Sequence, residues 1–111
     1  MYNDGPMSEI AVELDLAEKN RREGFESRAR VLARRAAAKA ILEYFKRRNL
    51  PAANLNALDL IQAFKDLPDI SPDMRRSSEM LLLRVNEAFQ LPSDVDLIAV
   101  ARRLVQELGR D

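Results

Sequence analysis

Four basic side chains recur along one segment of the sequence at spacings that place them on one side of a helix. Arg28, Arg35, Lys39 and Lys46 lie within about 40° of one another when successive residues turn by about 100°. We call these four residues the basic face. Such a row of guanidinium and ammonium groups can bind the phosphates of RNA or of a nucleotide. Further along the chain, Arg84 follows several leucines and is a fifth candidate for phosphate contact.

The distribution of charge leaves two interpretations of the basic face open. Residues 19–48 hold eleven basic and three acidic side chains, a net charge of +8, and the rest of the 111-residue chain carries −8. The basic segment could attract nucleic acid, or it could face acidic helices of its own fold or of a second copy. Because the whole chain has 18 basic and 18 acidic residues, we favour the structural interpretation.

Histidine and cysteine are both absent from the sequence. Their absence excludes disulfides, thiol chemistry, most zinc sites and catalytic triads that contain histidine. The three glycines, Gly5, Gly24 and Gly109, are isolated and form no phosphate-binding loop. Glu9 and Glu13 share a helix face, but ordinary solvated glutamates do the same, so we do not predict a catalytic pair. We therefore expect no enzyme activity, no cofactor and no metal site.

Arginine accounts for fourteen of the eighteen basic residues, and ten of these arginines form adjacent pairs. Neighbouring residues on a helix point about 100° apart, so one of each pair can face solvent while the other buries its stem at a helix interface. We interpret the pairs mainly as ion-pairing and solubility devices rather than as a phosphate-binding groove. The pairs occupy positions 21–22, 34–35, 47–48, 75–76 and 102–103.

Apolar residues recur at intervals of three and four along the whole chain, which predicts an all-α fold. Short connections between the helices predict an up-and-down bundle of four or five helices. We expect this bundle to be a single domain over residues 1–111, with 1–7 as a flexible N-terminal segment. The helices are expected at about 8–22, 25–49, 56–67, 71–89 and 93–109.

Capping and breaking residues predict where these helices begin and end. Gly24 predicts a break between the first two helices, and Gly109 predicts a C-terminal cap. The residues expected to cap helix starts are Ser8, Asn54 or Asn56, Ser71 followed by Pro72, and Ser93 in a capping box that Asp96 completes.

The helix expected at 25–49 has an apolar side in addition to its basic face. Most of the apolar residues are alanines, which let a neighbouring helix approach closely, so we interpret this side as a packing seam. Because aromatic residues mostly fall on such apolar sides, base stacking is not predicted. The residues expected on the seam are Phe25, Ala29, Leu32, Ala33, Ala36, Ala37, Ala40, Ile41 and Tyr44.

Four consecutive apolar residues, Met80 to Leu83, predict self-association. Four consecutive positions sweep about 300° of a helix, which is more than one core-facing side needs. A partner should cover the surplus side, so we expect a homodimer.

The alanine-rich run Leu32–Glu43, which reads Leu-Ala-Arg-Arg-Ala-Ala-Ala-Lys-Ala-Ile-Leu-Glu, resembles the second helix of HEPN-domain proteins. The segment Ala57–Ile61 is similar to the short Asp-Leu-Leu helix of that family. A later helix pair joined at Leu91–Pro92 extends the resemblance to about residues 8–108. The resemblance implies a small helical bundle that forms a homodimer and works beside a nucleotidyltransferase or in RNA-directed defence.

Active members of that family carry an arginine followed a few residues later by a histidine, and the resemblance makes Arg84 the corresponding arginine. The positions where the histidine would stand hold Phe89, Gln90 and Leu91, none of which can transfer a proton near neutral pH. The sequence therefore predicts a non-enzymatic, HEPN-like interaction or accessory module. A module that binds RNA or nucleotide phosphates through residues 28–46 is the alternative. No stretch can span a membrane or direct secretion, so we expect a cytoplasmic protein.

Overall fold

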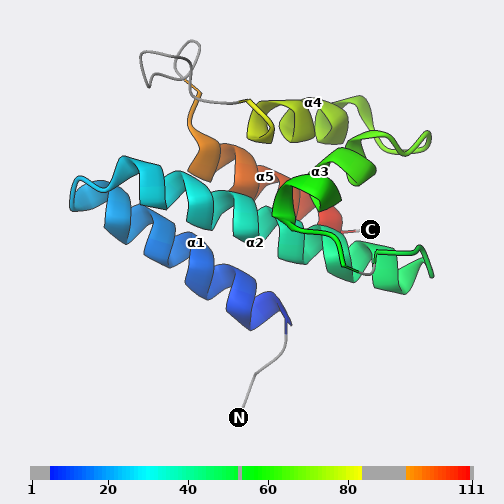
Figure 1. Ribbon diagram of the computed structural model, residues 1–111, viewed down its shortest axis with the longest axis horizontal. Helices are drawn as coiled ribbons and strands as arrows, with labels where there is room; N and C mark the ends of the chain where they lie inside the picture. Colours follow the sequence, from blue (N-terminus) through cyan, green and yellow to red (C-terminus); the bar gives the residue numbers. More distant parts are fainter. Residues whose placement is uncertain (1–5, 53, 84–94, 111) are drawn as a thin grey trace.

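The computed structural model describes residues 6–52, 54–83 and 95–110, which contain helices and no strand. The expected all-α fold is confirmed. Four of the five helices alternate in direction, as an up-and-down bundle requires, and the remaining short helix is the third along the chain (Figure 1). The helices are α1 (Pro6–Arg22), α2 (Glu26–Arg47), α3 (Ala57–Lys65), α4 (Pro72–Leu81) and α5 (Leu97–Gly109).

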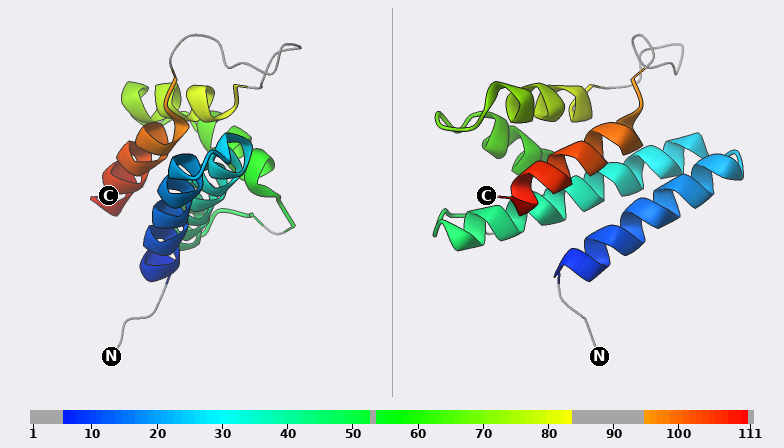
Figure 2. Two further views of the ribbon diagram at one scale, coloured as in Figure 1. Left: turned by 90° about the vertical axis from the view of Figure 1, so that its left-hand side faces the viewer. Right: turned by 180° about the vertical axis from the view of Figure 1, so that it is seen from behind.

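α2 is the central helix of the bundle. α1, α3 and α5 all pack against it, and α4 completes the bundle by packing on α3 and α5. Seen from behind, α5 crosses over α2 while α1 runs antiparallel beside it (Figure 2). Small side chains let three helices approach one helix closely. The buried residues of α2 are Ala29, Ala33, Ala36, Ala37, Ala38, Ala40, Ile41, Tyr44 and Phe45.

An aromatic contact holds α3 against the C-terminal part of α2. The rings of Tyr44 and Phe64 meet edge to face, with centroids 5.4 Å apart, and both residues are buried. Such a pair contributes about 0.5–1.5 kcal/mol beyond the burial of its area. Because α3 has only nine residues, it leaves the N-terminal part of α2 uncovered on this side (Figure 1).

Local sequence signals correctly predicted several helix ends. The Asn56 side chain accepts a hydrogen bond from the Asp59 N–H at the start of α3. Ser71 accepts one from the Met74 N–H at the start of α4, where Pro72 is the first helical residue. Gly24 separates α1 from α2 at a φ of +89°, a conformation that glycine adopts without strain.

Other predicted ends were wrong. α1 begins at Pro6, ahead of the expected cap Ser8, because proline suits the first turn of a helix. Residues 6 and 7 are therefore helical, and residues 1–5 lie outside the described part of the chain. Asp96 is itself the N-cap of α5, since its carboxylate accepts from the Ile98 and Ala99 N–H groups; Ser93 lies outside the described residues.

The C-terminal ends also differ from expectation. α2 ends at Arg47 rather than Asn49, and Asn49 has a φ of +56°. Gly109 is the last residue of α5 rather than its cap. α4 ends at Leu81 instead of continuing to about residue 89, of which residues 84–89 lie outside the described part. None of the described helices is long and apolar enough to cross a bilayer.

Candidate functional site

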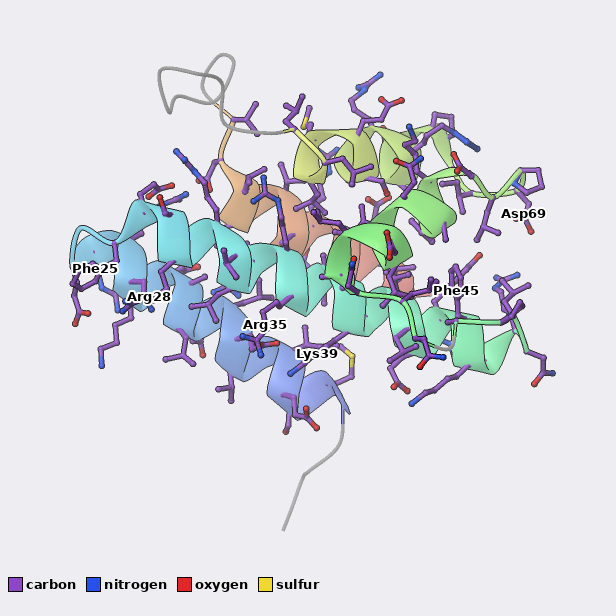
Figure 3. All side chains as sticks on the ribbon, viewed as in Figure 1. Phe25, Arg28, Arg35, Lys39, Phe45 and Asp69 are labelled. Atoms are coloured by element: carbon purple, nitrogen blue, oxygen red, sulfur yellow. The ribbon has the colours of Figure 1, made fainter. Side chains whose placement is uncertain are left out.

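The basic face lies along the side of α2 that borders α1. Figure 3 shows Arg28, Arg35 and Lys39 in a row on this side. Arg28, Arg35 and Lys46 are exposed and Lys39 is partly buried. Arg84 lies outside the described residues, so the structure does not place it beside the other four.

Acidic residues of α1 engage the middle of the basic face. The Lys39 ammonium lies 2.9 Å from Oε1 of Glu13 and 3.4 Å from Oε1 of Glu9. Arg35 Nε lies 3.3 Å from Oε2 of Glu13. The interaction with Glu13 is the main reason that the pKa of Lys39 is raised, and partial desolvation opposes this shift. These contacts agree with the interpretation in which basic residues face an acidic helix of the same fold.

Glu13 is not the solvated glutamate that its spacing from Glu9 suggested. It is only 7% exposed, because it lies on the side of α1 that faces α2. A buried carboxylate needs a charged or hydrogen-bonding partner, and Arg35 and Lys39 supply it. Its position in the sequence carried a signal, since Glu13 lies next to Leu14 and three residues after Ile10, both of them core residues.

The two ends of the basic face differ from its middle. The Arg28 guanidinium lies 5.0 Å from the centroid of the Phe25 ring, and no carboxylate among the described residues pairs with it. Phe25 is 49% exposed, so its expected place in the packing seam was wrong. Phe25 directly follows Gly24 and precedes the first residue of α2 (Figure 3). The helical spacing that placed its side chain on the packing seam therefore does not apply to it. At the other end, Lys46 pairs with Glu43 at 3.4 Å.

A shallow groove of about 180 Å³ lies between α2 and α3, next to the basic face. Most of its lining is apolar. Arg35 and Lys39, which contact Glu13 of α1, also line it. The groove depends on where α3 packs, so no sequence pattern could predict it. Its lining residues are Arg35, Ala38, Lys39, Leu42, Ala57 and Leu60.

The arginine pairs follow the expected division of roles in part, since Arg47 is as exposed as Arg48. In each pair the second arginine is exposed, and the first binds another part of the fold. Arg21 pairs with Glu26 and Asp96, which raises its pKa even though burial opposes the shift. Arg102 donates to Glu18 at 2.7 Å and ties α5 to α1.

The other three first members donate to main-chain carbonyls at the C-terminal ends of helices. Cations stabilise these ends because the last carbonyls of a helix lack partners and carry partial negative charge. The two bonds from Arg34 are accepted by carbonyls at and just beyond the end of α4. The contacts are Arg34 to Leu81 and Leu83, Arg75 to Lys65 and Leu67, and Arg47 to Leu108.

The run Met80 to Leu83, on which the expected self-association was based, is only partly accessible in the structure. Leu81 is fully buried, and the other three residues are partly buried, with Leu82 packed against the core. Because α4 ends at Leu81, these residues do not occupy all sides of one helix.

Within the part of the chain that the structure describes, no three acidic residues group together in a way that could hold a metal ion. The chain matches no protein-family model, no curated protein and no solved structure, so the resemblance to HEPN domains and the role it implies stay predictions.

Proposed function

We propose that this chain is a non-enzymatic helical module that binds other proteins. The observation that carries this proposal is the engagement of Arg35 and Lys39 by the buried carboxylate of Glu13. Phosphate binding uses several basic groups at once, and here Lys39 lies against two carboxylates and Arg35 lies against one of them. Glu9 and Glu43 also lie against the basic face and would repel phosphates.

Exposed apolar side chains give further support to a protein partner. Aliphatic and aromatic residues at the surface are the groups that protein interfaces bury. Three of them lie on α1, which borders the basic face, and Val31 lies on α2 itself. The exposed large apolar residues are Met7, Val12, Leu16, Phe25, Val31, Leu55 and Leu58.

The resemblance to HEPN domains adds a homodimer and an enzyme partner such as a nucleotidyltransferase to this proposal. We also propose a cytoplasmic location. A homodimer would form outside the basic face, because two copies meeting there would bring like charges together. Light scattering at micromolar concentration tests the dimer. A single species of 12.6 kDa would contradict it.

RNA or nucleotide-phosphate binding is the second candidate, and the contact between Arg28 and Phe25 favours it. A base can stack on an exposed aromatic ring while a neighbouring arginine contacts phosphate. This arrangement occurs at one end of the basic face, where no acidic residue among those described engages Arg28.

Fluorescence anisotropy of labelled single-stranded RNA and duplex DNA separates the two candidates. We expect no binding that depends on the basic face at low or physiological salt. The test variant replaces Arg28, Arg35, Lys39 and Lys46 by glutamine, and the control replaces the exposed arginines 22, 76 and 103 in the same way. Binding that is lost only in the test variant, with a log–log salt slope of roughly −3 for four phosphate contacts, would replace our proposal.

A further inference from the structure

One strip of α2 has the spacing by which a helix receives another helix along its length. Its residues alternate at intervals of three and four, and they fall within about 80° of the helix surface. This alternation is the pattern of paired helices that pack side by side. The residues are Arg28, Val31, Arg35, Ala38 and Leu42, and we call them the open strip.

No helix among the described residues covers the N-terminal part of the open strip. Val31 is 51% exposed, and the Arg35 side chain is 56% exposed. Ala38 and Leu42 form part of the floor of the groove against α3. A helix laid on the strip would therefore bury Val31 and could place an apolar side chain in the groove.

The basic residues of the strip have donors left for a partner. Arg28 contacts the Phe25 ring, and no carboxylate among the described residues pairs with it. Arg35 lies 3.3 Å from Glu13 through Nε, and more than half of its side chain is exposed. The two arginines are seven residues apart, about 10 Å along the helix. Carboxylates two turns apart on a partner helix would match this separation. Glu13 is buried and so does not face an approaching acidic residue, and Glu9 and Glu43 lie against Lys39 and Lys46, which are not residues of the strip.

Charge also distinguishes between a second copy of this chain and a different protein as the partner that covers the strip. A second copy of the strip would bring Arg28 and Arg35 against the same two cations, with Lys39 and Lys46 of the basic face close by, and like charges across an interface oppose binding. Building on the proposed function, we infer that the open strip binds an acidic amphipathic helix of a different protein. The apolar residues of that helix pack on Val31 and Leu42, and its carboxylates pair with Arg28 and Arg35.

The test is an NMR titration of the ¹⁵N-labelled full chain with two synthetic helical peptides. Both peptides carry leucines along one face, which are flanked by glutamates in the first peptide and by lysines in the second. We expect saturable shifts of amides between Arg28 and Leu42. The glutamate peptide should bind about tenfold more tightly than the lysine peptide, because like charges oppose the second complex.

Variants of the strip locate the contact. Arg28→Gln combined with Arg35→Gln should weaken binding about five- to tenfold, the combined effect of two exposed ion pairs. Val31→Asp should weaken it at least about tenfold, because it places a carboxylate at the centre of an apolar contact. The control, Arg76→Gln with Arg103→Gln, makes the same change of charge on exposed residues of α4 and α5 and should leave binding unchanged. Circular dichroism confirms that each variant is folded.

The other outcomes overturn the inference. Equal affinity for both peptides, or no amide shift at about 1 mM peptide, would contradict the inference that the strip binds an acidic helix. Shifts on the strip that grow with protein concentration alone would make a second copy its occupant. Shifts of amides on another face would show that the open strip is not the binding site, but they would still agree with the proposed protein-binding function. Shifts of the strip with single-stranded RNA, and with neither peptide, would overturn the proposed function as well.

Discussion

The two sides of α2 show that the apolar character of a side chain does not by itself decide whether it is buried. Ala33, Ala36 and Ala37 on the alanine side are fully buried, whereas the larger and more apolar Val31 on the open strip is 51% exposed. The seventeen residues of α1 and the thirteen of α5 lie along the alanine side. The nine residues of α3 cover only one end of the other side. Burial along α2 therefore follows the lengths of the helices that pack on it.

The largest expected effect comes from enlarging a residue on the alanine side. Ala33→Leu should destabilise the fold by up to about 3 kcal/mol, because the added atoms have no space between closely packed helices. The matched change on the open strip, Val31→Leu, should shift stability by less than about 0.5 kcal/mol. Urea unfolding followed by circular dichroism measures both variants. Equal effects would mean that the two sides of α2 are packed alike.

The next effect compares the two members of one arginine pair. Arg34→Ala should cost about 2 kcal/mol, because it removes two charge-assisted hydrogen bonds of 2.7 Å to the Leu81 and Leu83 carbonyls. Arg35→Ala should cost less than about 1 kcal/mol, since the Arg35 side of the ion pair is exposed and Glu13 keeps Lys39 as a partner. Differences in the urea midpoint test the ranking, and a larger effect at Arg35 would reverse it.

A smaller effect is expected where α1 meets the basic face. Glu13→Gln should destabilise the fold by about 1 kcal/mol, because Lys39 and Arg35 lose their shared partner but can both reach water. Thermal unfolding at low and high salt measures this difference. The gap between wild type and variant should narrow at high salt as the charges are screened. A gap independent of salt would show that packing rather than charge holds Glu13 in place.

The smallest effect concerns Asp96 and is measured as a difference in how stability depends on pH. Although burial acts to raise the pKa of Asp96, hydrogen bonds from Arg21 and the Ala99 N–H lower it overall. A carboxyl group with a lowered pKa stabilises the fold above its unfolded value of about 3.9, and this contribution is lost as the pH falls through the folded pKa. Asp96→Asn keeps a good N-cap but does not titrate. Its stability should therefore decline less steeply than that of wild type between about pH 5 and pH 2, as urea midpoints would show.

The features that the sequence predicted well depend on neighbours in the chain. Asn56 and Ser71 cap helices through the residues that directly follow them, and Gly24 supplies a turn through its own backbone. The row formed by Arg28 and Lys39 follows from the helical repeat alone. These properties need no knowledge of how the helices pack.

The features that the sequence missed depend on distant contacts. α4 ends at Leu81, where it meets Arg34 from 47 residues earlier in the chain. Glu13 is buried because an antiparallel helix presents Arg35 and Lys39 to it. The groove at the candidate site likewise exists only because α3 packs beside α2. Patterns within one helix carry no information about these partners.

The three arginines that donate to main-chain carbonyls give the fold an uneven tolerance of mutation. Arg75, for example, binds the carbonyls of Lys65 and Leu67, and every amino acid at those two positions would still supply a carbonyl. At position 75 itself, only arginine offers a planar, permanently charged fork that reaches both acceptors. The residues that supply the carbonyls can therefore be substituted without loss of the contact, whereas the arginine cannot. Each such contact at a helix end depends on the identity of one residue, the arginine.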